Sequence, residues 1–167
     1  MADNLTSEQR HKCMASIQGK NTKPEMVVRR FLHSAGYRYG LHNKKLPGKP
    51  DIVLRKYKTV IFIHGCFWHG HERCKYSHLP KSNFNYWEQK INHNKERDLN
   101  SKLELVKEGW KVITIWECDL RDRNKRESVL YSLLNQLESI KNQILKYNYI
   151  QNNSIATEEE SQYVKIN

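Results

Sequence analysis

Cysteines and histidines crowd one short stretch of this 167-residue chain, which reads IHGCFWHGHERC from Ile63 to Cys74. Within it, one histidine and two cysteines have the spacing C-x4-H-x2-C, and another cysteine follows further along the chain. Three thiolates and one imidazole form a typical closed, tetrahedral site for structural zinc. The candidate zinc ligands are Cys66, His71, Cys74 and Cys118. The alternative is a pair of buried free cysteines beside a solvated histidine loop; Cys13 has no ligand neighbours in either case.

A carboxylate and two further histidines lie at the ends of two short apolar runs. Asp51 opens the first run, His64 ends the second, and His69 follows in the loop. If the runs pair as an antiparallel hairpin, the start of one and the end of the other meet at the same edge. Phosphodiester cleavage needs a divalent ion and a base that activates water, for which Asp51 suits Mg²⁺ and His69 suits the base. A lone aspartate at a strand start is, however, more often a solvated turn residue.

The elements that must position these side chains alternate between strands and helices. The runs Asp51–Leu54 and Thr59–His64, separated by RKYK, predict a β-hairpin, and a short strand is expected at Tyr37–Leu41. TVIFIH shows no polar alternation, as expected of a strand covered on both faces. WKVITIW, from Trp110 to Trp116, predicts a second central strand that delivers Cys118 at its end.

Helices are predicted from capping residues and apolar spacing. A capping box at Thr6–Gln9 opens a short polar helix to about Ile17, and Thr22, Pro24 and Glu25 start a second helix that Gly36 ends. A long helix is expected from about Asn85 to Glu108, and a last one from near Asn124 towards Leu145. The apolar marks of the long helix are Trp87, Ile91, Leu99, Leu103 and Val106.

The layout predicts an α/β fold, a small mixed β-sheet flanked by helices. We expect one domain over residues 1–150, whose first 20 residues include the N-terminal helix, and a flexible tail over residues 151–167. No apolar run is long enough to cross a membrane, and the first residues lack the hydrophobic region of a signal peptide. The sequence therefore predicts an intracellular, cytoplasmic protein in which disulfides are not expected.

The charge of the chain favours a polyanionic partner. The formal net charge is +11, and residues 1–75 hold 15 Lys and Arg against five Asp and Glu. Lys44, Lys45 and Lys49 surround the turn before Asp51, where they could contact phosphates. Basic charge alone does not separate DNA from RNA or from general stickiness.

The stretches LPGKPDIVL, TVIFIHGCFWHGHERC, WEQKI and GWKVITIWEC together resemble the very short patch repair (Vsr) DNA mismatch endonucleases. The resemblance runs from about Ser7 to Leu137. It implies a fold similar to the PD-(D/E)xK nucleases, although no acidic-x-Lys motif follows Asp51 on the next strand, which ends Ile63-His64 instead. It also implies the same four zinc ligands that the spacing gives.

The resemblance assigns roles to the candidate catalytic residues. Asp51 and the backbone carbonyl of Ile63 would hold Mg²⁺ with waters. His69 would act as general base, and His64 and Glu25 would order the network of metal-bound waters. A carbonyl ligand tolerates isoleucine at position 63.

Apolar side chains in the polar loop suggest contacts with bases. Phe67 and Trp68 could act as a wedge that unstacks base pairs, at a cost that a mismatched step lowers; the alternative is that they fold back over the zinc site. By resemblance, Trp87 would join them on one face, Met14 would enter from the opposite groove, and Lys49 would contact the DNA.

The sequence thus predicts a zinc-stabilised, Mg²⁺-dependent endonuclease that nicks duplex DNA 5′ to the thymine of a T:G mismatch. Such mismatches arise when 5-methylcytosine is deaminated, and the nick would initiate very short patch repair. We expect a monomer, with mismatch-repair proteins of the MutL type as candidate partners. The alternatives are a restriction-type endonuclease that cuts unmismatched DNA and a non-catalytic zinc module that binds nucleic acid.

Overall fold

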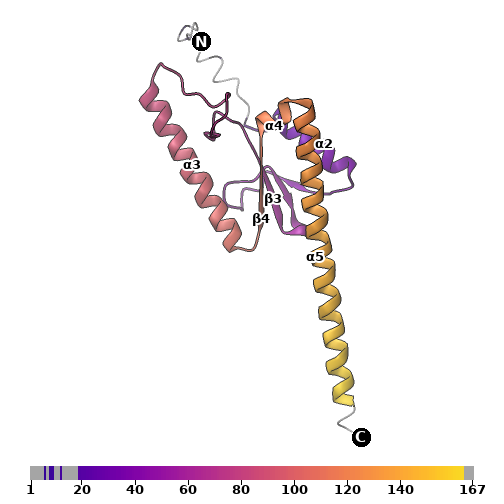
Figure 1. The fold of residues 1–167 in the computed structure, drawn as a ribbon. Coiled ribbons are helices and arrows are strands. Elements are labelled where there is room, and N and C mark those ends of the chain that lie inside the picture. The colour runs from indigo at the N-terminus through magenta and orange to yellow at the C-terminus, as the bar shows by residue number, and fades with distance from the viewer. Residues whose placement is uncertain (1–5, 7, 10–11, 13–18, 164–167) are drawn as a thin grey trace. The chain divides into compact units, whose positions relative to one another are not determined.

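The computed structural model of the chain describes residues 6, 8, 9, 12 and 19–163. It divides into two compact units, Met1–Leu130 and Tyr131–Asn167. The first unit contains the sheet and all the candidate site residues that the structure describes (Figure 1). None of the described helices is both long and apolar enough to cross a membrane.

Within the described residues, four strands form one mixed sheet in the order β1-β2-β3-β4, which confirms the predicted small mixed sheet. The prediction that the strand ending at Trp116 is central was wrong: β4 pairs with β3 alone among the described strands and lies at the edge, and only one of its residues is buried. The two pairings of β3 differ: β2 and β3 are antiparallel, as the predicted hairpin requires, whereas β3 and β4 are parallel. The edge strand β1 pairs antiparallel with β2 and covers only part of the stretch predicted for it. The strands are β1 (Gly40–Leu41), β2 (Ile52–Leu54), β3 (Thr59–His64) and β4 (Lys111–Trp116).

Tight turns and one long crossover connect the strands. The 3-10 turn η1 (Arg55–Tyr57) joins β2 to β3, and Lys58 closes it in the left-handed conformation. Parallel strands cannot be joined by a tight turn. The connection from β3 to β4 therefore runs through the loop that carries the cysteines and through helix α3 (Phe84–Lys107).

Helix α2 (Lys23–Ser34) begins where its capping residues predict. The Thr22 hydroxyl accepts a hydrogen bond from the backbone N–H of Glu25, and proline occupies the first turn. Val28 and Leu32 are fully buried. This cap matters for function because it places Glu25 at the N-terminal end of the helix, beside the strand ends.

The core extends on both faces of the two central strands. Val53, Val60 and Leu105 form a cluster against which Phe62 and Trp110 pack, so α3 covers this face. Ile52 and Ile61 alternate with these residues and point to the opposite face, on the side where Figure 1 places α2. Thr59–Ile61 are all buried, as the apolar run of β3 predicts.

The inward face of α3 differs from the predicted one. Leu99, Leu103 and Val106 are more than half exposed, whereas the buried positions are Ile91, Asn94, Ser101 and Leu105. Together with Asp98, these four positions recur every three to four residues and so lie on one face of the helix. The apolar spacing predicted the wrong buried face because the buried face carries the polar side chains that line the site. The three apolar residues lie on the exposed face instead.

Two helices follow β4. The five-residue α4 (Glu117–Arg121), which the sequence analysis did not predict, starts directly after the strand and carries Cys118 in its first turn. Helix α5 (Arg123–Tyr163) begins one residue before the predicted start. Residues 151–163 were predicted to belong to a tail, but the helix continues through them. No glycine or proline in this stretch interrupts it. The single domain over residues 1–150 and the flexibility of the tail stay predictions.

Candidate active site and metal centre

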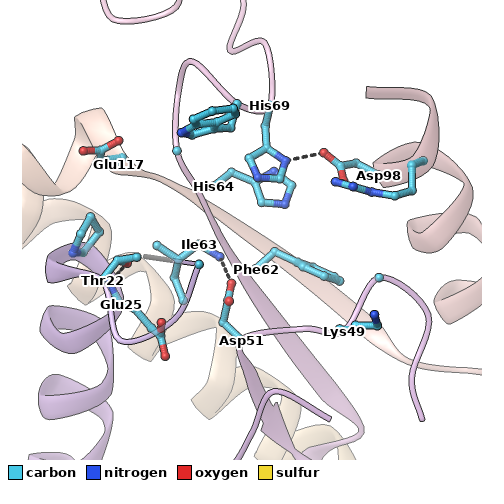
Figure 2. A pocket seen from close by; sticks show the side chains of 16 residues that line it. Thr22, Glu25, Lys49, Asp51, Phe62, Ile63, His64, His69, Asp98 and Glu117 are labelled. Atoms are coloured by element: carbon cyan, nitrogen blue, oxygen red, sulfur yellow. Dashed lines mark hydrogen bonds and ion pairs between the residues drawn. The ribbon is translucent and has the colours of Figure 1, made fainter. Parts of the chain in front are cut away.

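A cavity of about 680 Å³ opens where β3 ends. Its walls come from five parts of the first unit: the start of α2, the turn before β2, the end of β3 with its following loop, the middle of α3 and the start of α4 (Figure 2). The polar and charged lining residues include Glu25, Lys49, Asp51, His64, His69, Arg97, Asp98 and Glu117.

Asp51 is held against the end of β3. Its Oδ2 accepts a hydrogen bond of 2.7 Å from the backbone N–H of Ile63, which confirms that the start of β2 and the end of β3 meet (Figure 2). The pairing of β2 with β3 ends at Ile52, the first residue of β2, which lies opposite Ile61, so Ile63 extends beyond the part of β3 that pairs with β2. In an extended strand the N–H and C=O of one residue point to the same side, so the Ile63 carbonyl also faces the cavity beyond the end of β2. Asp51 Oδ1 and this carbonyl are two oxygen donors of the kind that hard divalent cations prefer.

The charge of Asp51 is only partly compensated by its neighbours. Burial raises the pKa of Asp51, and the negative charge of Glu25 raises it further, while the hydrogen bond from Ile63 acts in the opposite direction. His42 and His69 also lower this pKa, but they are the two weakest of the influences on it. A divalent cation at this point would favour the ionised form. The donor set and its charge therefore fit a bound metal ion.

His64 and His69 stack face to face, with ring centroids 3.8 Å apart and planes 8° from parallel. Burial, and next the neighbouring His69, lowers the pKa of His64 to about 4, so this ring is neutral near pH 7. Nδ1 of His69 makes a short hydrogen bond to Oδ2 of Asp98 (Figure 2). An imidazole held in this way presents its other nitrogen, Nε2, to the cavity as a proton acceptor.

Asp98 is a site residue that sequence reasoning missed. Burial by itself would raise the pKa of Asp98, but the hydrogen bond and charge of His69, together with Arg97, lower it below its usual range. Its second oxygen, Oδ1, accepts from Arg97 at 3.0 Å. The available signal was positional: Asp98 lies seven residues after Ile91 and seven before Leu105, on the buried face of the long helix.

The ligand atoms of His64, His69 and Asp98 lie within 4.8 Å of one another and could hold a metal ion. The stacking of the two rings argues against that use, because the in-plane lone pairs of parallel imidazoles do not converge on one point. The hydrogen bond between His69 and Asp98 is instead the arrangement of a base and the group that orients it.

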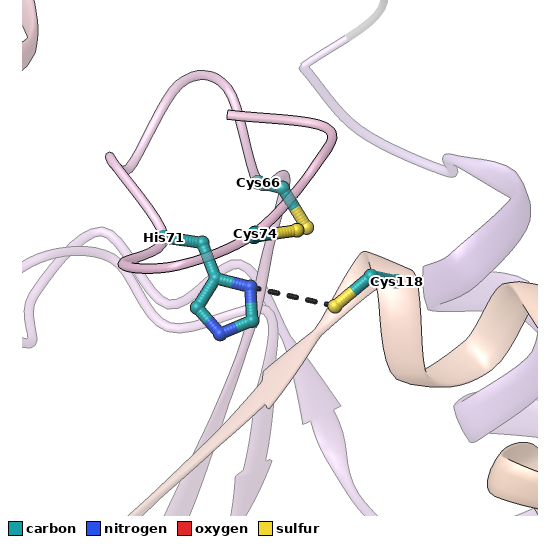
Figure 3. Close-up of side chains that lie close together, drawn as sticks. All are labelled: Cys66, His71, Cys74 and Cys118. Carbon is teal, nitrogen blue, oxygen red and sulfur yellow. Dashed lines mark hydrogen bonds between the residues drawn. The ribbon is translucent and has the colours of Figure 1, made fainter. Parts of the chain in front are cut away.

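The four predicted zinc ligands converge in space. Their ligand atoms lie within 4.8 Å of one another, with His71 Nδ1 3.4 Å from the Cys118 sulfur (Figure 3). Cys66, Cys74 and Cys118 are free thiols. Burial, and next the neighbouring Cys66, raises the pKa of Cys118 to about 12. Such a thiol loses its proton when a metal ion replaces it, so the cluster has the composition of a closed metal site.

Trp116, the last residue of β4, lies between the cysteine cluster and the cavity. Its ring stacks on His71, with centroids 4.0 Å apart, and meets the edge of His64 at 5.4 Å. The parallel register pairs His64 with Trp116, which places the two at the same level of the sheet. Trp116 therefore contacts both a candidate metal ligand, His71, and a residue that lines the cavity, His64.

The three aromatic side chains predicted to contact bases beside the mismatch lie together, and one of them, Trp68, lines the cavity. Phe67 lies 5.2 Å from Trp87 and from Trp68, and the two tryptophans lie 5.9 Å apart, between ring centroids. All three are half-buried. The carbonyl of Trp68 accepts a 2.9 Å hydrogen bond from the buried side chain of Asn94, which fixes the loop to α3.

Comparison with known proteins identifies the family. Residues 2–75 match the family model described as DNA mismatch endonuclease Vsr. The DNA mismatch endonuclease Vsr of Escherichia coli is 38% identical over 125 residues, which are 75% of this chain and 80% of the relative. The chain belongs to the Vsr family of DNA mismatch endonucleases.

Other Vsr-like relatives are named as nicking enzymes. The type II nicking enzyme V.NmeAIP of Neisseria meningitidis is 52% identical over 74% of this chain and 87% of its own length. V.XorIIP of Xanthomonas oryzae, also a type II nicking enzyme, is 47% identical over 80% of this chain and 98% of its own length. This Vsr-family chain is thus a DNA endonuclease.

Three more residues were singled out by the Vsr resemblance: the structure describes Glu25 and Lys49, and it does not describe Met14. Glu25 is 2% exposed, and its Oε1 lies 3.2 Å from Arg29 Nη1 and 3.1 Å from His42 Nε2. Lys49 is exposed at the cavity rim, in the left-handed conformation. Met14 lies outside the described residues, although the predicted capping box before it is present, with Thr6 and Gln9 exchanging hydrogen bonds.

Proposed function

We propose that this Vsr-family endonuclease uses Mg²⁺ to nick one strand of duplex DNA 5′ to the thymine of a T:G mismatch. Such mismatches are left by deamination of 5-methylcytosine, and the nick would start very short patch repair. The observation that carries the proposal is the meeting, in one cavity, of Asp51 with the His69–Asp98 pair.

Asp51 and the carbonyl of Ile63 would hold the Mg²⁺. The bound ion supplies positive charge that polarises the scissile phosphate and stabilises the departing oxyanion. Asp51 is preset for this role because the N–H of Ile63 holds its Oδ2 and leaves Oδ1 to face the cavity. Glu25, buried next to it, would order the waters around the ion.

His69 would take the proton from the attacking water. Asp98 holds the Nδ1–H of His69, so the lone pair on Nε2 is the acceptor, and the imidazolium that forms is stabilised by the same carboxylate. Neutral His64, stacked on the base, adds no positive charge that would weaken it. It can therefore orient water without competing for the proton.

Phe67, Trp68 and Trp87 would enter the base stack beside the mismatch. Their half-buried cluster leaves part of each ring open to a ligand, and separating a stacked step costs about a few kcal/mol, less where pairing is already weakened. Met14 would enter from the opposite groove, and Lys49 would contact a phosphate. Zinc is the ion we propose for the Cys66 cluster, because three thiolates and one imidazole suit it.

The test is a nicking assay on end-labelled duplexes that differ only at one base pair, T:G, T:A or C:G, with Mg²⁺ present. We expect nicking of the thymine strand of the T:G duplex alone. Asp51→Asn should abolish it, whereas Glu104→Gln, an exposed carboxylate on α3, should not change it. Full activity of Asp51→Asn would refute the catalytic assignment.

Relatives of this chain are named type II nicking enzymes, and a second candidate function is therefore a nicking enzyme. We take fully paired DNA as the substrate of this alternative. Equal nicking of all three duplexes would select this alternative. We also propose that the chain acts as a monomer, which light scattering of the purified protein with and without DNA tests; a mass of two or more chains would contradict it. A mismatch-repair protein of the MutL type is a proposed partner.

A further inference from the structure

A histidine without a role in the proposed chemistry lies between two of the cavity's carboxylates. The ring of His42 places Nε2 3.1 Å from Oε1 of Glu25 and Nδ1 3.9 Å from Oδ1 of Asp51. Its side chain is 19% exposed. The Nε2 contact is at ion-pair distance but outside hydrogen-bond geometry, and Nε2 has no hydrogen-bond partner among the described residues. The contact with Glu25 is therefore one of proximity and charge rather than a hydrogen bond.

The backbone brings His42 to this position at some cost. His42 follows the edge strand β1, and its N–H donates to the carbonyl of Asp51 at 3.2 Å, which extends the pairing of β1 and β2 by one step. Its φ of +44° lies in the left-handed region, which is uncommon for residues other than glycine. Strained conformations of this kind persist where the surrounding structure holds them and cluster at functional sites.

Glu25 and Asp51 carry charges of the same sign close together, and the side chain of His42 contacts both. Glu25 is buried and contacts one permanent cation, Arg29, and its charge raises the pKa of Asp51. Asp51 Oδ2 is committed to Ile63, so Oδ1 is the oxygen that remains for a metal ion. At 3.9 Å, His42 is too far from Oδ1 to bond it directly. The ring of His42 thus lies beside Oδ1 and leaves this oxygen without a hydrogen bond from the ring.

We propose that His42 is a positioning residue for the catalytic metal: by separating Glu25 from Asp51 it sets the two carboxylates to face one metal–water cluster. This inference rests on the part of the proposed function that makes Asp51 a metal ligand. Groups that orient metal ligands in this way affect metal affinity directly. Among the described residues, the charged groups within ion-pair distance of His42 are Glu25 and Asp51, and Arg29 contacts the same oxygen of Glu25.

Two amide substitutions separate positioning from packing. In His42→Gln the side-chain nitrogen reaches the position of Nε2 and can donate to Glu25. In His42→Asn the amide reaches only the position of Nδ1, although asparagine adopts left-handed backbone more readily than glutamine. A backbone or packing role therefore favours the asparagine variant, whereas contact with Glu25 favours the glutamine variant.

The experiment measures Mn²⁺ binding to the DNA-free protein by electron paramagnetic resonance, with Asp51→Ala defining the site. We expect His42→Asn to weaken this binding by about tenfold or more and His42→Gln to stay within about twofold of wild type. Thermal unfolding of each variant is recorded in parallel, and His33→Asn, an exposed histidine on α2, is the matched control.

The outcomes distinguish this inference from the proposed function. Wild-type affinity in His42→Asn, equal weakening in both variants with equal loss of thermal stability, or the absence of an Asp51-dependent Mn²⁺ site would each overturn the inference. Mn²⁺ binding that follows the expected order in a protein that fails to nick T:G duplexes would support the inference and refute the proposed function.

Discussion

Individual carboxylates at this site are stabilised to different degrees, and the difference follows from their neighbours. Asp98 has a histidine and an arginine beside it, which favour its ionised form. Asp51 has one backbone N–H, a second carboxylate and only weakly acting histidines nearby, so burial dominates and its pKa is raised. The first suits a residue that holds a base in place, and the second suits one that waits for a cation.

Asp98→Asn should lower the rate of nicking with little effect on DNA affinity. The amide can still contact His69, but it cannot stabilise the imidazolium that forms when Nε2 takes a proton. General base catalysis contributes about 10²- to 10⁴-fold, and we expect the single-turnover rate to fall by an amount in this range. Equal binding of wild type and variant in a filter or anisotropy assay is the control. A rate within a factor of about two of wild type would exclude His69–Asp98 as the base.

Asp51→Asn should stabilise the metal-free protein while it removes activity. Because the pKa of Asp51 is raised in the folded state, the folded protein binds more protons than the unfolded chain between the ordinary and the raised pKa. Stability is therefore lost as pH rises through that interval, and the loss is complete above it. Asparagine carries no charge and still accepts from Ile63, so we expect a gain of about 0.5–2 kcal/mol at pH 7.

The measurement is chemical unfolding at pH 7 and at pH 4, in buffer without Mg²⁺ and without a zinc chelator. The gain in stability should shrink at pH 4, and added Mg²⁺ should stabilise wild type but not the variant. A variant that is less stable than wild type at both pH values would contradict this account.

The secondary structure elements differ in how far the sequence predicted them. Helix α2 and the β2–β3 hairpin follow from local signals: the Thr22 cap, the proline in the first turn and an apolar run flanked by turn residues. The predicted orientation of α3 was wrong because its buried face includes Asn94 and Asp98. The hydrogen-bond partners of these two side chains lie on a loop that is distant in sequence. Pattern analysis assumes that buried means apolar, and that assumption fails where a helix lines a site.

The turn before β2 approaches α3 closely at Gly48, and a substitution there would show whether this close approach is required. Its φ is +68°, and a Cβ atom built there would lie 2.9 Å from the Cβ of Ser101 and 3.1 Å from the ring of Phe62. Gly109 has a similar φ of +79° but nothing within 4 Å of such an atom. Alanine at either position incurs about 1–2 kcal/mol of backbone strain, and overpacking at Gly48 adds about 1–3 kcal/mol.

Gly48→Ala should therefore destabilise the protein more than Gly109→Ala and should also slow nicking, because the displaced turn carries Lys49 and Asp51. Chemical unfolding gives the first comparison and the T:G assay the second. Equal destabilisation by the two variants would mean that the turn can move away from α3 without cost.

At the scale of the whole chain, the excess positive charge and most of the candidate zinc ligands lie in the same part of the sequence. Residues 1–75 hold most of the excess positive charge, and they include Asp51, His69 and three of the four residues of the metal cluster. The fourth, Cys118, comes from the start of α4, after the crossover helix. A bound zinc ion would thus tie the loop after β3 to the end of β4. The spacing of the short-range ligands predicted this cluster, whereas its contact with the cavity through Trp116 depends on the parallel pairing of β3 and β4.

Zinc removal should consequently unfold more than the loop. Structural zinc sites contribute several kcal/mol of folding free energy, and each kcal/mol shifts the melting temperature of a chain of this size by about 2–4 °C, so we expect a fall of more than about 10 °C. Cys74→Ser should have the same effect and should lower the zinc content measured by mass spectrometry, whereas Cys13→Ser should change neither. Because Trp116 stacks on His71 and contacts His64, nicking should decline as zinc is withdrawn, even below the melting temperature, and return when zinc is restored. Full activity in protein shown to contain no zinc would separate the two sites and contradict their coupling through Trp116.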